Sequence, residues 1–152
     1  MKKILMVLGA IFLVIVLLGI IGFSILAVKG SALDKESKSY VDTVAPIILA
    51  NLSKETLFEY ADDQLKNSVK PEEFEKMFNW FSKLGNFVEY KEPKGQANIS
   101  ITTESGKVIT GYYEVFAEFE TGPATVRIII IKRGNDWKII GFHINSPALF
   151  NQ

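Results

Sequence analysis

The chain contains no cysteine and a single histidine among its 152 residues. Without thiols it cannot form disulfides, hold a metal through thiolates or carry a lipid on cysteine. One histidine, His143, cannot build a histidine-based metal site alone. No catalytic or cofactor-binding motif stands out either, so we expect no cofactor and no metal. These absences leave location, fold and surface as the properties that the sequence addresses.

The chain also lacks a cluster of basic residues. Three of its 17 Lys and Arg residues (Lys2, Lys3 and Lys29) precede residue 30, whereas all 17 Asp and Glu residues follow it. The remainder therefore carries a net charge of about −3. Nucleic-acid binding requires a basic patch, so we expect no nucleic-acid partner.

One long apolar run is present, at residues 4–28, and it contains neither charge nor proline. A bilayer core needs about 20 apolar residues in a helix, whereas a cleavable signal has an apolar region of about 7–15. Gly30-Ser31-Ala32 is a passable cleavage site, but the run is too long for the usual substrate. The sequence therefore predicts a retained transmembrane anchor over 1–29. The short segment before it favours a signal-anchor, with the N-terminus cytoplasmic and the domain periplasmic or extracellular.

Three further segments follow the predicted anchor. Residues 30–39 are polar and form either a stalk or the start of a helix. Residues 40–147 are long enough for one domain with its own core, and residues 148–152 form a C-terminal tail.

The first half of the domain has the spacing of helices. The first predicted helix carries its apolar residues at helical spacing, and Pro46 should kink or split it. Ser53 can cap a second helix. Pro71 and Gly85 suit the start and end of a third. The apolar stripes of the three helices are Tyr40, Val41, Val44, Ile47 and Ile48; Leu57, Phe58, Ala61 and Leu65; and Phe74, Met77, Phe78, Phe81 and Leu84.

After Gly85 the apolar period changes to two, which indicates strands. Residues 86–92 read as one strand, 97–120 as two around Glu-Ser-Gly, and 124–145 as two around Arg-Gly-Asn-Asp. Successive turns of this kind predict an antiparallel meander. The sequence thus predicts an α+β fold, with three helices packed on a curved antiparallel sheet of four to five strands, behind the N-terminal transmembrane helix.

Two stretches carry a family resemblance: FNWFSKLG, and GYYEVFAEFETGPATVRIIIIKRGNDWKIIGFHINSP. Together with the helix-then-sheet order, they resemble the nuclear transport factor 2-like domains with the cystatin-like fold. They look like the small extracytoplasmic bacterial members, many of which are known as domains of unknown function. The resemblance implies a fold more than an activity, because the matching residues are structural. That superfamily includes isomerases, dehydratases, transport factors and assembly domains.

Counting by two along the strands separates an apolar face, expected to meet the helices, from a mixed face. A bulge would shift this parity beyond it. The mixed face is the candidate interaction surface, and we expect it to bind a second copy, as a homodimer, or a neighbouring membrane protein. The residues assigned to it are Tyr112, Phe116, Arg127, Ile129, Ile131, Trp137, Ile139 and His143. Alternatively, the C-terminal tail folds back and covers part of it.

Two functional hypotheses follow. The first is a non-catalytic binding or scaffold domain that uses the mixed face. The second is a small-ligand pocket protein or an isomerase- or hydrolase-like enzyme, with its acid or base between the sheet and the helices. Tyr113, Asp62 and Asp63 are its candidates, although adjacent acids on a helix face different directions and cannot form a carboxylate dyad.

Overall fold

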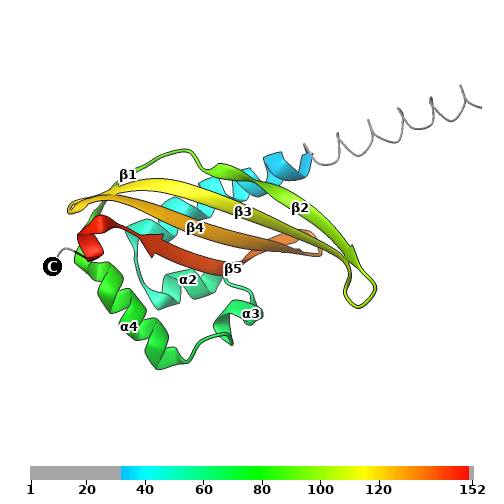
Figure 1. The fold of residues 1–152 in the computed structure, drawn as a ribbon, viewed down its shortest axis with the longest axis horizontal. Helices are drawn as coiled ribbons and strands as arrows, with labels where there is room; N and C mark the ends of the chain where they lie inside the picture. Colours follow the sequence, from blue (N-terminus) through cyan, green and yellow to red (C-terminus); the bar gives the residue numbers. More distant parts are fainter. Residues whose placement is uncertain (1–31, 151–152) are drawn as a thin grey trace, which may run out of the picture. The chain divides into compact units, whose positions relative to one another are not determined.

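A computed structural model describes residues 32–150 of the protein, and Asp34 begins a compact unit (Figure 1). Residues 32–50 form a helix that is followed by three more helices and then by the sheet. The elements are α2 (Lys54–Tyr60), α3 (Asp63–Lys66), α4 (Pro71–Phe81), the 3₁₀ turn η1 (Ser82–Leu84), β1 (Phe87–Tyr90), β2 (Lys94–Thr102), β3 (Gly106–Phe119), β4 (Gly122–Arg133), β5 (Asp136–Asn145) and the 3₁₀ turn η2 (Pro147–Leu149).

The five strands form one antiparallel sheet. Strands β2 to β5 follow one another as a meander, because β2 pairs with β3, β3 with β4 and β4 with β5. Strand β1 pairs with the end of β3 that β2 leaves free. β1 and β2 are therefore successive segments along a single edge, and the predicted meander is confirmed for β2 to β5.

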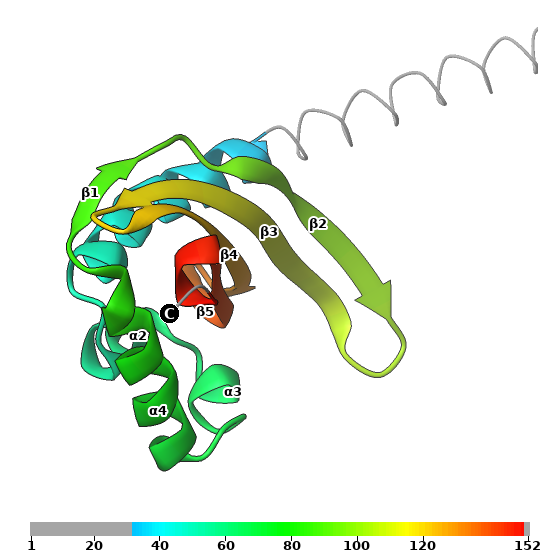
Figure 2. The ribbon, with the colours of Figure 1, turned by 60° about the vertical axis from the view of Figure 1, so that its left-hand side comes forward.

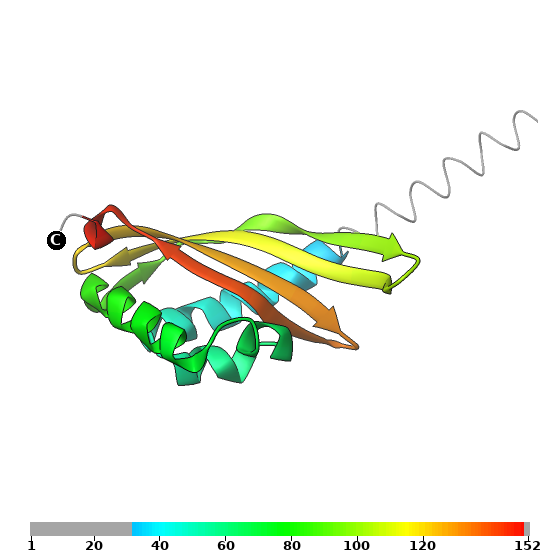
Figure 3. The same ribbon diagram turned by 60° about the horizontal axis from the view of Figure 1, so that its bottom comes forward.

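The helices cover one face of this sheet, which we call the inner face; the opposite face is the outer face (Figure 3). Side chains from both layers form the core between them. On the sheet side its members are Tyr113, Val115, Ala117 and Phe119 from β3, and Val126, Ile128 and Ile130 from β4. Aromatic contacts join the helices, as between Phe58 and Phe74, whose ring centroids lie 5.2 Å apart edge to face. The α+β layering expected from the residue periods is confirmed.

The helix over residues 32–50 corrects one expectation and decides another. It continues through Pro46, although proline removes a backbone donor there. The neighbours Val44, Ala45, Ile48 and Leu49 are buried, so packing holds the helix together across the missing hydrogen bond. The helix also includes residues 32–39, which shows that this segment starts the helix and is not a separate stalk.

The second predicted helix is two helices. α2 ends at Tyr60 because Ala61 takes an extended conformation and forms a parallel bridge with Ile139 of β5. Asp62 then caps α3, its side chain accepting from the Gln64 N–H. Leu57, Ala61 and Leu65 are nevertheless buried as expected, because the short helices turn their apolar sides to the same core.

The third predicted helix, α4, is confirmed in position and in its buried side. Phe74, Phe78 and Phe81 are buried in α4. Leu84 is buried in η1, which continues the helix to Gly85. Gly85 has a φ of 76°, and a Cβ there would lie 2.6 Å from the Glu120 carboxylate. Both the conformation and the lack of space therefore require glycine.

The predicted transmembrane helix is not part of this fold as described. Residues 4–28, like the rest of the predicted anchor over 1–29, lie outside the described residues. Among residues 32–150, no helix combines the length and apolar character needed to cross a bilayer. The fold class is therefore corrected to α+β with a five-stranded antiparallel sheet.

We expect Phe78→Ala to lower the free energy of unfolding by about 3–5 kcal/mol, because it empties a buried position on α4, where the ring packs edge to face on Phe81. Urea unfolding of the full chain measures the change. Asn79→Ala, at the exposed neighbouring position, is the matched control and should cost less than about 0.5 kcal/mol. A loss below about 1 kcal/mol for Phe78→Ala would contradict the assignment of this stripe to the core.

Candidate binding face

The pairing of β4 with β5 is irregular, and this moves two of the expected interaction residues to the other face. Ile129 pairs with Gly141, but the next residue, Ile130, pairs with Ile139. Ile140 is thus an extra residue in β5, and side chains before it point to the opposite side. Ile139 and Trp137 lie on the inner face and are 0% and 5% exposed. Their assignment to the mixed face was wrong.

The other six expected residues remain on the outer face, but one of them, Ile131, is buried there. Tyr112, Phe116, Arg127 and His143 are exposed, and Ile129 is half-buried. Ile131 keeps the outer register opposite Thr110 but is only 5% exposed. The structure thus brings five of the eight candidates together on an accessible surface.

The outer face is built from cross-strand rows. One row is charged, with Lys94, Glu114, Arg127 and His143 paired in turn from β2 to β5. Arg127 Nε donates to Glu114 Oε1 at 3.2 Å. On one side of this row lie Tyr112 and Ile129, which also pair, and on the other lie Phe116 and Thr125. Opposite charges thus alternate between two rows that contain aromatic rings.

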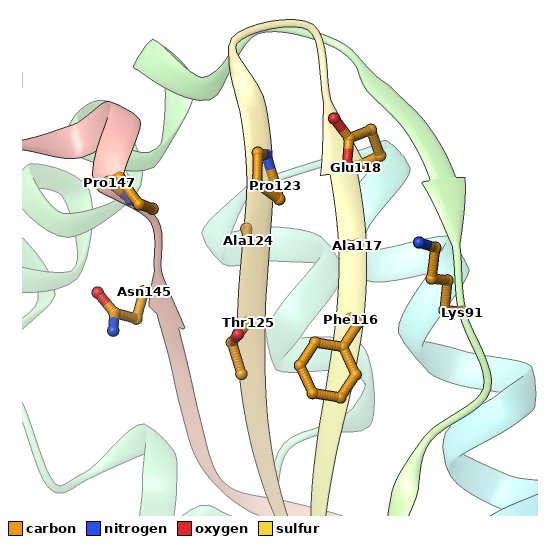
Figure 4. Close-up of a pocket in the computed structure, with 9 residues that line it drawn as sticks. All are labelled: Lys91, Phe116, Ala117, Glu118, Pro123, Ala124, Thr125, Asn145 and Pro147. Atoms are coloured by element: carbon orange, nitrogen blue, oxygen red, sulfur yellow. The ribbon is translucent and has the colours of Figure 1, made fainter.

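Two adjoining hollows lie on this face. One, of about 300 Å³, is lined by Glu114, Arg127 and His143 of this row and by Phe116, Thr125 and Asn145. The second, of about 410 Å³, shares the last three of these residues and extends toward Lys91 and Pro147. Figure 4 shows Phe116 and Thr125 side by side on β3 and β4, with the helices behind the strands. We call the two hollows together the outer-face groove; its lining residues are Lys91, Glu114, Phe116, Ala117, Glu118, Pro123, Ala124, Thr125, Arg127, His143, Asn145 and Pro147.

The described part of the C-terminal tail leaves most of this groove open. Residues Pro147–Leu149 form η2, in which Leu149 is buried. The next residue, Phe150, packs edge to face on Trp80 of α4, with 5.6 Å between ring centroids. The tail thus turns toward the helices, and Pro147 touches only the rim of the groove. Within residues 147–150, the alternative that the tail covers part of the outer face is limited to Pro147, while Phe150 packs on the helices.

On the inner face, Tyr113 points toward the helices as the pocket hypothesis required, but its hydroxyl is engaged. It lies 2.5 Å from Ser37 Oγ and donates to the Asp34 carbonyl at 3.3 Å. Tyr113 and Ser37 are both fully buried. Burial raises the pKa of Tyr113, and the Ser37 hydrogen bond acts in the opposite direction. The geometry makes Tyr113 a tie between the sheet and the first helix.

The other two candidates, Asp62 and Asp63, have different surroundings. Asp62 forms a two-point ion pair with Arg133, with distances of 3.0 and 3.2 Å. Hydrogen bonding to Arg133 is the main cause that lowers the pKa of Asp62. Asp63 points into solvent. The two acids face different directions, as expected, and Asp62 has the structural role of capping α3 and holding the end of β4.

Sequence reasoning missed a polar cluster at the start of the first helix. Glu36 accepts from Lys132 Nζ at 2.7 Å and from Trp137 Nε1 at 3.1 Å. Hydrogen bonding to Lys132 is the main cause that lowers the pKa of Glu36. The signal was present: Ser37 stands four residues before Val41, so the helical period extends back into the segment that could have been a stalk.

Comparison with known protein families, curated proteins and solved structures finds no match. The resemblance to nuclear transport factor 2-like domains therefore stays a prediction from the sequence. The functional argument has to proceed from the geometry of this chain.

The buried Tyr113 hydroxyl yields an expected pH dependence. Its folded-state pKa lies above the unfolded value of about 10, so it stabilises the fold fully below pH 10 and progressively less as the pH rises further. Tyr113→Phe removes this titration, and stability should then fall less steeply. Urea midpoints at about pH 8 and about pH 11 measure the slope.

At pH 7, Tyr113→Phe should cost about 1 kcal/mol, because it removes one buried hydrogen bond while Ser37 keeps its bond to the Asp34 carbonyl. Tyr112→Phe, on the exposed outer face, is the control and should change the neutral-pH stability by less than about 0.5 kcal/mol. An unchanged alkaline slope in Tyr113→Phe would contradict the structural role of this hydroxyl.

Proposed function

We propose that this domain is a non-catalytic binding or scaffold module that binds another protein chain through its outer-face groove. The observation that supports this best is the exposure of large aromatic side chains beside paired charges. Tyr112 and Phe116 are 40% and 38% exposed, and both flank the row from Lys94 to His143. Aromatic anchors within a polar surround are typical of protein interfaces.

The charges of this face favour a protein over a lipid surface or a polyanion. Glu114 and Arg127 neutralise each other, and Lys94 Nζ lies 5.6 Å from the centre of the Phe116 ring. A surface with interspersed charges of both signs steers a partner into one orientation, whereas a polyanion requires one dominant sign. The two hollows adjoin along β3 and β4, which gives a segment of another chain room to lie on them.

The inner side offers less support for a pocket enzyme. Tyr113 is tied to Ser37, Asp62 to Arg133, and Glu36 to Lys132 and Trp137. Among the described residues, every buried side-chain nitrogen and oxygen has a hydrogen-bond partner. A general acid or base needs a reacting proton within hydrogen-bond reach, and these groups are instead satisfied by the fold itself.

A photo-reactive amino acid at His143, which lines the groove and is exposed, tests this proposal in cells producing the full chain. We expect a discrete cross-linked band whose mass identifies either a second copy or another protein. Phe116→Lys should remove the band, because it places a charge at the centre of the groove. Thermal stability should stay nearly unchanged, since Phe116 is already partly in water.

Val88→Lys is the matched control, because Val88 is an exposed apolar residue on β1 that does not line the groove. This variant should keep the band. A band that survives Phe116→Lys would place the interface elsewhere, and the absence of any discrete band from His143 would contradict the proposal.

A further inference from the structure

Strand β2 forms an edge of the sheet that is open on one side. It pairs with β3 along its whole length, from Lys94 opposite Glu114 to Thr102 opposite Gly106, without a register shift. Within residues 32–150, no strand pairs with its other side. Figure 2 shows the β2–β3 hairpin extending past the helices, with β2 outermost.

This edge lacks the features that usually prevent strands from pairing with other chains. Edge strands are commonly protected by charged residues, proline or a bulge. Residues 95–102 contain neither a charge nor a proline. Ile99 and Ile101 are 42% and 77% exposed on the same side of the hairpin, where a soluble protein usually carries polar side chains.

One hydrogen bond shows which backbone groups of β2 point outward. The Ala97 N–H donates to Asp34 Oδ1 at 2.7 Å and so faces away from β3. Backbone groups alternate along a strand, so those of Ile99 and Ile101 also face outward. Asp34 occupies the edge at Ala97, which leaves residues 98–102 as the segment free to pair.

We propose that this segment pairs with the same segment of a second copy, antiparallel, about a twofold axis at Ser100. In this register Ile99 lies opposite Ile101 of the second copy, and their outward N–H and C=O groups bond to each other. Asn98 lies opposite Thr102, and Ser100 lies opposite its own counterpart. The Asp34–Ala97 hydrogen bond stays intact and limits the ladder at each end.

A second copy is the occupant that this edge fits best, because the segment is complementary to itself. The pairing places apolar against apolar side chains on one side and hydroxyl or amide groups against each other on the other side. No charge is buried and none is left unpaired. A twofold axis perpendicular to the strands also joins the two sheets into one and puts both outer-face grooves on the same side, which would let the dimer bind two sites at once.

Single cysteines test the register cleanly, because the chain has no cysteine of its own. In the proposed pairing, the two copies of Ser100 form a non-hydrogen-bonded pair with Cα atoms about 4.5 Å apart, a separation that a disulfide accepts. Mild oxidation of full-length Ser100→Cys should therefore give a covalent dimer. Asn98→Cys should give about tenfold less, because its own counterpart lies four residues along the strand, about 13 Å away.

Two further measurements decide the result. A mixture of Asn98→Cys and Thr102→Cys chains should cross-link, since these positions face each other in the proposed register. Adding Ile101→Pro to Ser100→Cys should abolish the dimer, because proline removes an outward N–H while the pairing with β3 does not use that donor. Adding Ile101→Val should preserve it, and circular dichroism checks that both variants are folded.

Three outcomes would overturn the proposal. Ser100→Cys remaining monomeric would exclude the pairing. Equal cross-linking at positions 98, 100 and 102 would show random collision. Cross-linking that persists in folded Ile101→Pro would show that the copies meet without this backbone ladder, as they would if they paired through the outer faces.

Discussion

The register irregularity between β4 and β5 determines which side chains of the last strand belong to the core. One extra residue in β5 turns Trp137 and Ile139 to the helix side while His143 and Gly141 stay in the outer register. Trp137 can then donate to Glu36 and lie beside Lys132. The Ile139 carbonyl can then accept a hydrogen bond from the Asp62 N–H, and Ile139 forms the bridge that ends α2. Without the bulge, a tryptophan and an isoleucine would lie in water and the first helix would lose its contact with β5.

The first helix is attached to the sheet mainly by polar contacts at its start and by apolar packing further along. Asp34, Glu36 and Ser37 reach β2, β5 and β3 respectively, while Val41, Ala45 and Ile48 are buried. Of these three residues Ser37 is fully buried, and its hydroxyl is paired with Tyr113, so its burial costs little. The same contacts explain why the helix includes a polar segment that composition alone assigns equally well to a stalk. They also engage the inner tyrosine, which otherwise would be the first candidate for chemistry.

The two exposed surfaces differ in the physics of recognition. The outer-face groove combines aromatic rings with alternating charges, which gives orientation and selectivity toward a chemically distinct partner. The β2 edge offers unpaired backbone groups and uncharged side chains that are complementary to themselves, which favours a partner of identical sequence. The two surfaces share the sheet but few residues: the Lys94 and Gln96 side chains belong to the outer rows, whereas pairing uses residues 98–102. Occupation of one therefore leaves the other accessible.

Residue periods alone were sufficient for the α+β class, for α4 and for the meander from β2 to β5, but not for the pairing of β1 with β3. These features depend on short-range patterns: an apolar residue every three or four positions, alternation in strands, and Pro71 and Gly85 at the ends of a helix. For the same reason, Tyr112, Phe116, Arg127 and His143 were assigned correctly to the outer face. The extra residue of β5, Ile140, leaves the alternation in β3 and β4 and the register of His143 unchanged.

Contacts between distant residues decided the rest. The position of the bulge depends on how β5 fits against both β4 and Ala61, which no local pattern encodes, and it moved Trp137 and Ile139 to the core. Packing of Val44, Ala45 and Ile48 keeps the helix continuous at Pro46, where the sequence predicted a kink or a split. Partners 76 to 101 residues away in the sequence made Glu36 and Ser37 part of the domain. Local spacing thus fixes the fold class and the alternation of the strand faces, although it did not show that the second predicted helix is two helices. The tertiary structure alone decided which polar groups are paired and which surfaces remain open, because both depend on what each element meets in space.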